Sequence, residues 1–272
     1  MLTMDLAVIT HKPEGIQRVA KMVLPPMEGV RYVVSWQNHQ GAPIPAELNR
    51  PDVEIHRFEH AGQVWNRNNA FLHCKADIVV FSDDDLIYKS EELLNLRSFY
   101  ELNHDVDVVA FQSEHIGSDC SYPSGAIKLS SKYPRGYYAS GFELSFRRKR
   151  VGNLKCHPLF GLGSPKLHGG EDELLLYAAI KRGLNCWFAP ITVCEHNHPS
   201  TGTKAKLTNE NLRAMGAVLA LQNPRTALLR VPLKAWRISR KGQASILRSL
   251  AYVTSGAIHA PFIFYRTRKY FW

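Results

Sequence analysis

The chain has 272 residues, 45% of them hydrophobic and 21% charged, which is the composition of a globular protein with one large domain, or one domain and an appendage. Its formal charge of +10 comes from the last quarter, because residues 204–272 hold 13 Lys and Arg against one acid, Glu210, whereas the preceding residues hold 21 basic and 23 acidic side chains. The five cysteines are scattered and form no C-x-x-C pair, which argues against a disulfide framework and a thiolate zinc site and favours a reducing cytosol. The amino-terminal residues have no basic n-region, so we expect no signal peptide.

Apolar strands and helices alternate along the first part of the chain. Strands are predicted at 6–10, 30–35, 53–58 and 78–82, and helices at 14–23, 63–74 and 90–102. This alternation predicts an α/β fold with a mostly parallel sheet flanked by helices. Such sheets bind ligands at the carboxyl ends of their strands.

The pattern then becomes less regular. The sequence predicts strands at 106–111, 142–146 and 187–194, a helix at 171–182, a polar functional loop at 117–136 and a glycine-rich loop at 158–170. Pro190 interrupts the last strand, so we expect that strand at an edge of the sheet. We divide the chain into an α/β domain, residues 1–203, and a basic helical extension, residues 204–272, whose first helix is predicted at 204–222.

Three adjacent carboxylates, Asp83-Asp84-Asp85, directly follow the apolar strand predicted at 78–82. Carboxylates this close repel one another by roughly 1 kcal/mol per pair even in water, so we expect a cation between them. Hard oxygen ligands of this kind suit Mg²⁺ or Mn²⁺. The alternative is that the aspartates cap a helix, but the next helix is predicted to begin at Ser90.

A second acidic cluster, Glu171-Asp172-Glu173, opens the helix predicted at 171–182. One interpretation is structural, because acids in the first turn of a helix are favoured by about 0.3–1 kcal/mol each. The other is catalytic, because an inverting group transfer needs a carboxylate that takes the proton of the attacking hydroxyl. The spacing of the residues leaves both interpretations open.

Four segments, taken together and in this order, resemble the family 2 glycosyltransferases, which have the GT-A fold. They are the opening strand and loop Val8-Ile9-Thr10-His11, the helix with the pair Arg67-Asn68, the aspartates Asp83-Asp84-Asp85 as the DxD signature, and Glu171-Asp172 as the ED motif about ninety residues later. The resemblance runs from about residue 6 to 198 and implies a Rossmann-like GT-A sheet that binds a nucleotide-sugar.

The resemblance implies a role for each of these residues. Asp85 is expected to contact the Mn²⁺ or Mg²⁺ ion, Asp83 the nucleoside, and Asp84 the metal or the sugar. Asp172 is expected to be the catalytic base, with Glu171 as the second candidate. The other residues expected beside the donor nucleotide are Thr10, His11, Arg67 and Asn68. Without the resemblance, a surface ion pair would explain Arg67 equally well.

His196 and His198 follow the last predicted strand, and their i, i+2 spacing puts both on one side of an extended segment. The resemblance implies that a histidine from this place completes the ligands of the metal, and His196 is the preferred one; the alternative is a solvated loop histidine. The chain departs from the family after the second strand, where Trp36-Gln37-Asn38-His39 replaces Asp-Asp-Gly-Ser. The usual carboxylate to the base is therefore absent, and Gln37 or Asn38 is expected to hydrogen-bond the base instead.

The basic extension mixes cations with apolar and aromatic residues, as in Trp236 and the terminal stretch 262–272. This composition is typical of a segment that lies in a membrane interface next to anionic lipid, whereas Gly256 and Pro261 argue against a spanning helix. The alternative is a helical cap with solvated cations. No nucleic-acid partner is expected, because the cations belong to no recognisable nucleic-acid module.

The sequence therefore predicts an inverting, metal-dependent glycosyltransferase. It would move a hexosyl or N-acetylhexosaminyl group from a nucleotide-sugar, expected to be UDP-linked, to a glycan or lipid-linked acceptor in surface polysaccharide synthesis. We expect it in the cytoplasm, peripheral on the cytoplasmic face of the membrane. One alternative is a non-catalytic basic protein that binds membrane or RNA through the extension. Another is a sugar-nucleotide pyrophosphorylase, which would need a glycine-rich phosphate loop in place of Thr10-His11-Lys12-Pro13.

Overall fold

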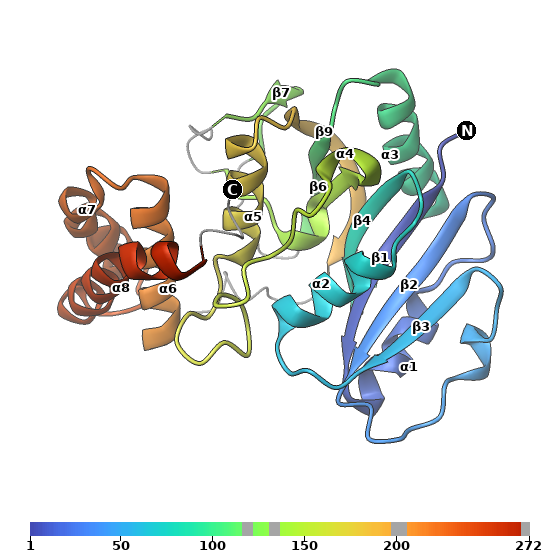
Figure 1. The fold of residues 1–272 in the computed structure, drawn as a ribbon, viewed down its shortest axis with the longest axis horizontal. Helices are drawn as coiled ribbons and strands as arrows, with labels where there is room; N and C mark the ends of the chain where they lie inside the picture. The colour runs from blue at the N-terminus through green and yellow to red at the C-terminus, as the bar shows by residue number, and fades with distance from the viewer. Residues whose placement is uncertain (116–121, 131–136, 197–205, 268–272) are drawn as a thin grey trace.

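The computed structural model describes residues 1–115, 122–130, 137–196 and 206–267 and shows one central sheet with helices on both of its faces (Figure 1). The predicted α/β architecture is confirmed. The strands are β1 (Met4–His11), β2 (Val30–Gln37), β3 (Val53–Phe58), β4 (Ile78–Asp83), β5 (Leu86–Ile87), β6 (Val108–His115), β7 (Ile127–Lys128), β8 (Leu144–Arg147) and β9 (Cys186–His196). The helices of this part are α1 (Lys12–Met22), α2 (Gln63–His73), α3 (Ser90–Leu102), α4 (Arg148–Val151) and α5 (Glu171–Lys181), with short 3-10 turns η1 (Ala46–Leu48) and η2 (Gly141–Glu143).

The strand order is β3-β2-β1-β4-β8-β6-β9-β5, and β7 pairs with β9. The first four strands in this order run parallel, and β1 and β4 are in register so that Ile9 lies opposite Asp83. The side chains of β1 alternate between the two faces. Met4, Leu6 and Val8 pack with α1 and α3, whereas Ala7 and Ile9 pack with α2 and α5. The carboxyl ends of β1 and β4 therefore meet at one edge of the sheet.

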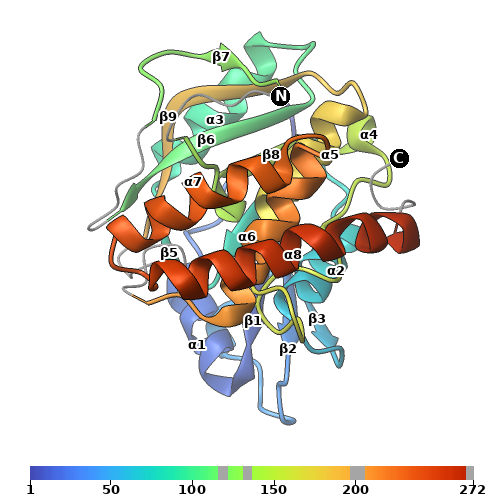
Figure 2. The same ribbon diagram turned by 90° about the vertical axis from the view of Figure 1, so that its left-hand side faces the viewer.

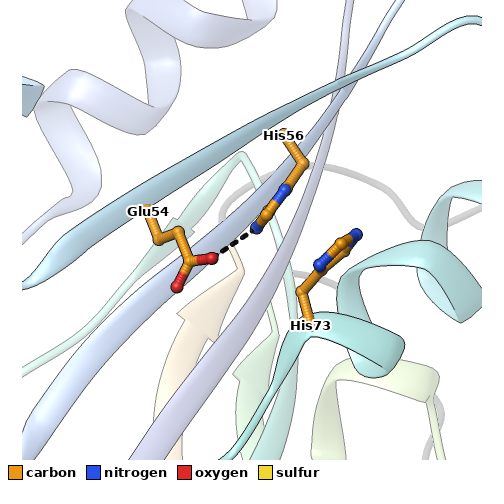
Figure 3. Close-up of side chains that lie close together, drawn as sticks. All are labelled: Glu54, His56 and His73. Carbon is orange, nitrogen blue, oxygen red and sulfur yellow. Dashed lines mark ion pairs between the residues drawn. The ribbon is translucent and has the colours of Figure 1, made fainter.

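β3 is the edge strand of the parallel half. Glu54 and His56 lie two residues apart on this strand, and both face His73, the last residue of α2 (Figure 3). The middle of α2 carries Arg67 and Asn68, so this helix links the sheet edge to Asp83 at the end of β4.

The prediction that the strand after Gly183 lies at a sheet edge is wrong. β9 pairs with β6 on one side and with β5 and β7 on the other. The β6–β9 register shifts between Ala110 and Gln112, and Pro190 falls in the part of β9 that this shift skips. A bulge of this kind leaves a residue outside the ladder, so the missing N–H of a proline costs no ladder hydrogen bond there.

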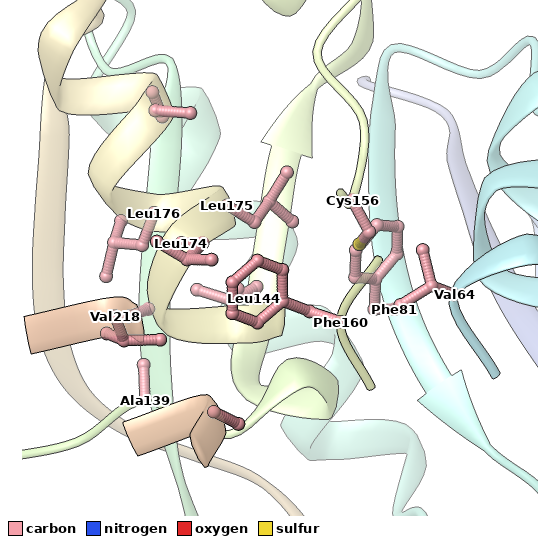
Figure 4. Packing of buried hydrophobic residues seen from close by; sticks show 14 of the residues in the cluster. Val64, Phe81, Ala139, Leu144, Cys156, Phe160, Leu174, Leu175, Leu176 and Val218 are labelled. Atoms are coloured by element: carbon pink, nitrogen blue, oxygen red, sulfur yellow. The ribbon is translucent and has the colours of Figure 1, made fainter. Parts of the chain in front are cut away.

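The glycine-rich loop after α4 is attached to the core by Phe160, whose side chain is buried. Figure 4 shows its ring between Leu174 and Leu175 of α5 on one side and Val64 and Phe81 on the other. Burying a phenylalanine contributes about 1.5–3 kcal/mol. The loop that precedes the acidic cluster of α5 is thus held in place by its own hydrophobic anchor.

The carboxyl-terminal part forms three helices, α6 (Asn209–Gln222), α7 (Ala227–Arg240) and α8 (Ile246–Thr267). α7 and α8 lie side by side as the outer layer of this side of the molecule (Figure 2). α6 begins at Asn209 rather than at Lys204 because the side chain of Thr208 caps it by accepting the N–H of Asn211. No helix in the described part of the chain is both long enough and apolar enough to cross a bilayer.

α6 and α8 cross at a pair of glycines. A Cβ on Gly216 would overlap the backbone of α8 at Val253, and one on Gly256 would overlap the backbone of α6 at Arg213. Apolar residues of all three helices belong to the same buried cluster as α2 and α5. The helices of the basic extension therefore cover part of the α/β core, as the cap interpretation expects.

Candidate active site

Asp83, the last residue of β4, and the two aspartates that follow it lie beside the end of β1, as the parallel pairing requires. The hydroxyl of Thr10 donates a hydrogen bond to Asp84, and Arg18 of α1 donates to both oxygens of Asp84 at 3.1 and 2.8 Å. Burial raises the pKa of Asp84, and the hydrogen bonds from Arg18 and Thr10 oppose that rise. Gly15 permits this contact, because a Cβ there would overlap Thr10 and lie 2.9 Å from Asp84 Oδ2. Asp84 thus joins β4 to α1.

Asp85 and His196 come together as the sequence predicts. The pairing of β5 with β9 places Leu86 opposite His196, and His196 Nε2 lies 3.5 Å from Asp85 Oδ2. The ring of His196 is stacked on Phe142, with 5.2 Å between centroids, which limits its rotation. Neighbouring ligands of an octahedral ion with bonds of about 2.1 Å are about 3 Å apart, so this carboxylate and imidazole fit two positions of one divalent ion. His198 lies outside the described residues.

Arg67 connects the two acidic motifs. Its Nη2 donates to Asp83 Oδ1 at 3.0 Å, and its Nη1 donates to Asp172 Oδ1 at 2.6 Å, although Arg67 and Asp172 are 105 residues apart in the chain. The side chain is 1% exposed, and its guanidinium lies over the ring of Phe81 at 5.4 Å. Burial opposes the charge of Arg67, but Asp172 and Asp83 outweigh that effect and raise its pKa. Arg67 is therefore a buried cation with two carboxylate partners, and the surface ion pair considered as its alternative is wrong.

The 3-10 turn η2 closes over this ion pair. The N–H of Gly141 donates to Asp172, and a Cβ on Gly141 would overlap Arg67 Nη1 and lie 2.6 Å from Asp172 Oδ1. Only a residue without a side chain fits between η2 and the ion pair. No local sequence pattern marks Gly141, because the contact depends on how β8 returns to the sheet.

Glu171 and Asp172 are both buried in the first turn of α5, which follows the left-handed Gly170. Burial raises the pKa of both carboxyls, and it raises that of Glu171 to about 7. Asp172 has Arg67 and Gly141 as donors, whereas Glu171 Oε2 has no hydrogen-bond partner among the described residues. The two neighbouring acids thus have different environments, one paired and one desolvated.

The glycine-rich loop packs on the amino end of α2. Leu162 O accepts the N–H of Gln63 at 2.9 Å, and a Cβ on Gly163 would lie 2.8 Å from the Cα of Gly62. A Cβ on Gly161 would likewise lie 3.3 Å from the carboxyl carbon of Glu171. These glycines are therefore required for close contacts beside the acidic cluster.

Several polar residues expected at the nucleotide make hydrogen bonds to the backbone of loops in this structure. Gln37 donates to the carbonyls of His60 and Gly62, and Asn68 is paired with the backbone of Cys156 through two hydrogen bonds of 2.9 and 2.8 Å. Their contact with a nucleotide stays a prediction. His11 is exposed at the end of β1. Asn66, which the sequence did not single out, donates to the carbonyl of Thr10 at 2.9 Å and fixes the end of β1 against α2.

The polar loop predicted at 117–136 lies largely outside the described residues, which include only 122–130 of it. Within that part, the hydroxyl of Tyr122 donates to the carboxylate of Glu143.

A comparison with protein families finds that residues 40–155 match the model of the family described as Glycosyl transferase family 2. No curated protein matches the chain in sequence. Among solved structures, the chain is similar to a crystal structure of S. aureus TarS 1–349, with 14% identity, a TM-score of 0.55, and coverage of 98% of this chain and 92% of that chain.

Two further structures of S. aureus TarS 1–349 give the same coverage, 98% of this chain and 92% of that chain. The complex with UDP has 15% identity and a TM-score of 0.57, and the complex with UDP-GlcNAc has 13% identity and a TM-score of 0.55. At such identities the likeness shows the fold, which is the GT-A fold that the sequence predicts.

Proposed function

We propose that this chain, which carries a family 2 glycosyltransferase domain in a GT-A fold, transfers a sugar from a UDP-linked donor to a glycan or lipid-linked acceptor in surface polysaccharide synthesis. The transfer would invert the anomeric carbon and would depend on a divalent cation, Mn²⁺ or Mg²⁺. TarS structures contain UDP and UDP-GlcNAc, which supports a UDP-linked hexosyl or N-acetylhexosaminyl donor.

One observation carries this proposal: a single buried side chain, Arg67, holds a carboxylate from the aspartates after β4 and another from the start of α5. Donor binding and proton abstraction need carboxylates on opposite sides of the reacting sugar, and the Arg67 bridge fixes the distance between them. The structural alternative is that Asp172 only stabilises the start of its helix. That role does not require the bridge, because exposed acids at a helix start are stabilised without a partner.

The chemistry assigns a task to each residue. A divalent ion held by Asp85 and His196 would neutralise the diphosphate that leaves. Asp172 would accept the proton of the acceptor hydroxyl as its oxygen bonds to the anomeric carbon, while the electron pair of the broken bond goes to UDP. Arg67 opposes the rise that burial causes in the pKa of Asp172 and orients its carboxylate for this step. Asp83 is the residue expected at the nucleoside.

The first test measures UDP binding by calorimetry with and without Mn²⁺. We expect metal-dependent binding by the wild type, loss of that dependence in Asp85→Asn, and no change in Asp105→Asn, an exposed aspartate between α3 and β6. Asp172→Asn should still bind UDP-GlcNAc but release UDP from it at least about 100-fold more slowly, the usual effect of losing a general base. A folded sample that binds none of UDP, GDP and TDP would overturn the proposal and favour the non-catalytic alternative.

The connection between β1 and α1 argues against the pyrophosphorylase alternative. α1 begins at Lys12, directly after β1 ends at His11, so no loop separates strand and helix there. A phosphate-cradling loop needs several backbone N–H groups that turn around the anion, and this connection leaves no residues for it.

We further propose that α7 and α8 bind the anionic surface of a membrane, on its cytoplasmic face. Exposed apolar side chains of α7 recur at helical spacing in Leu229, Leu233 and Trp236, and Leu229 is 81% exposed. α8 adds Leu247, Ile258 and Phe262. Cations of α7 flank its exposed face, and the acid nearest in sequence is Glu210 of α6.

Removal of α7 and α8 is a poor test of this proposal, because α8 packs on α6 and its loss would expose the core. Substitution of exposed residues avoids that problem. Wild type should cosediment with vesicles of phosphatidylcholine and phosphatidylglycerol at low salt, and Leu229→Asp combined with Trp236→Asp should weaken this severalfold. Equal sedimentation of both proteins, or equal binding to vesicles of phosphatidylcholine alone, would contradict it.

A further inference from the structure

A second group of metal-ligating side chains lies at the β3 edge of the sheet and takes no part in the proposed reaction. Glu54 and His56 project from β3, and His73 ends α2 (Figure 3). One ligand atom from each of the three lies within 4.8 Å of the other two. Glu54 Oε1 is 2.8 Å from His56 Nε2, and the two imidazole rings are stacked with 3.6 Å between centroids.

We propose that Glu54, His56 and His73 form a binding site for Zn²⁺ or a similar transition-metal ion, separate from the Asp85–His196 pair. Two imidazoles and one carboxylate are the ligand set of zinc sites that keep a fourth position for water. All three side chains are partly exposed, so an ion can enter and water can take the fourth position. This ligand set differs from the oxygen-rich one after β4, which suits Mg²⁺ or Mn²⁺.

The surrounding structure orients the carboxylate. Arg31 Nη1 lies 3.6 Å from Glu54 Oε2, and Arg31 is itself held by Asp5 through two hydrogen bonds of 2.9 and 3.0 Å. One oxygen of Glu54 therefore faces Arg31 while the other faces His56. Partners of this kind, which orient a ligand from behind, are a regular feature of metal sites.

The backbone that carries the three ligands is fixed. Glu54 and His56 are on a strand in register with β2, where His56 lies opposite Ser35. The hydroxyl of the same Ser35 accepts a hydrogen bond of 2.8 Å from Asn69 of α2, one helical turn before His73. Strand and helix are thus tied together beside the site, so side-chain rotation alone has to complete it.

Side chains of the group have to rotate before they can hold an ion. Ligand atoms in a tetrahedral zinc site are about 3.4 Å apart when the bonds are about 2.1 Å long. Atoms of the group that lie up to 4.8 Å apart therefore have to move closer, whereas Glu54 Oε1 and His56 Nε2, now 2.8 Å apart, have to separate slightly. Stacked imidazoles cannot both point their lone pairs at one ion, because the lone pairs lie in the ring planes. The ring of His73, at the last position of its helix, has to turn out of the stack toward Glu54 and His56.

Binding would connect the edge strand to the helix that carries Arg67. Because the ion bridges β3 and α2, it would stabilise the folded state in proportion to its occupancy. The measurable consequence is a zinc-dependent rise of several degrees in the thermal midpoint.

The test uses the full chain, freed of any histidine tag, with Zn²⁺ as the probe. Asp85→Ala removes a ligand of the donor-site ion and should leave this binding in place. In that background we expect one Zn²⁺ per chain by calorimetry, at least tenfold weaker binding in His73→Ala and in Glu54→Gln, and no change in His104→Ala, an exposed histidine after α3. Glu54→Gln keeps the shape of the side chain, so it serves if a histidine variant folds poorly.

Co²⁺ gives an independent readout, because its absorption spectrum distinguishes tetrahedral from octahedral ligand sets. A tetrahedral spectrum that disappears in His73→Ala supports the site. The proposal is overturned if the Asp85→Ala protein binds no Zn²⁺, or if His73→Ala and Glu54→Gln bind it as well as their parent. None of these outcomes depends on glycosyl transfer, so the proposed function can fail without this site failing.

Discussion

The Arg67 site and the carboxyl-terminal helices both concentrate charge, but they use it differently. Arg67 is almost completely buried and holds Asp83 and Asp172, which come from distant parts of the chain. In α7 the cations Arg230, Arg237 and Arg240 are exposed, on the same helix as exposed apolar residues such as Leu229. A buried charge depends on its partners, whereas a surface charge can be removed alone. The first arrangement fixes a site within the fold, and the second leaves a surface available to a partner.

The largest effect expected from this difference is that of Arg67→Ala. Removal of one partner from a buried ion pair costs about 3–5 kcal/mol, because the carboxylates left behind are uncompensated. Chemical unfolding should report a loss of this size, together with loss of activity. Arg150→Ala, which breaks a half-exposed ion pair with Asp107, is the matched control and should cost at most about 1 kcal/mol. Similar losses for the two variants would contradict the comparison.

The variant Gly141→Ala should show how much the site depends on its geometry, because it leaves the charged groups unchanged. Gly141→Ala inserts a Cβ against Arg67 and Asp172 without removing either group. We expect the free energy of unfolding to fall by about 1–3 kcal/mol and the rate of UDP release from UDP-GlcNAc to fall strongly. Gly125→Ala is the control, because a Cβ there has no neighbour within 4 Å. If Gly141→Ala retained full activity, the ion pair would not need the geometry seen here.

The pH dependence of stability should identify the desolvated acid. Burial raises the pKa of Glu171 from 4.5 to about 7, so between these values the folded protein holds a proton that the unfolded chain has lost. The contribution of Glu171 to stability is therefore full below about pH 4.5, falls as the pH rises to about 7, and is constant above that. The total fall is up to roughly 3 kcal/mol.

The side chain introduced by Glu171→Gln carries no charge, so this variant should lack the loss of stability expected between about pH 4.5 and 7. We expect its thermal midpoint to exceed that of the wild type by several degrees at pH 8, with the difference shrinking toward pH 5. Glu173→Gln, at a partly exposed position of the same helical turn, should show no such trend. A difference that is constant with pH would exclude the buried carboxyl as its cause.

The smallest effect is expected at the helical surface. Leu229→Asp should change the free energy of unfolding by no more than about 0.5 kcal/mol, because its side chain has little contact with the core. The control is Val231→Asp on the buried side of α7, which should destabilise by several kcal/mol. If both variants destabilise equally, the exposed face of α7 is not a free surface.

Local pattern was enough to predict where the three aspartates and His196 lie in the fold. An apolar run followed by aspartates places Asp83, Asp84 and Asp85 at the end of β4, and the strand before His196 carries that histidine toward Asp85. These predictions succeed because a strand is straight and its end is visible in the sequence. The edge position of β9 was predicted wrongly, because a bulge that accommodates Pro190 has no signature of its own in one sequence.

The sequence by itself determined the alternation of strands and helices, the carboxylate cluster after β4 and the acidic start of α5. Periodicity and short motifs encode such features, because they depend on neighbours along the chain. Only the tertiary structure decided that Arg67 joins the two acidic motifs, that Gly141 has to be a glycine, and that Glu54 and His56 meet His73. Those contacts join residues from separate elements, and their distances follow from how the elements pack, which no local pattern records.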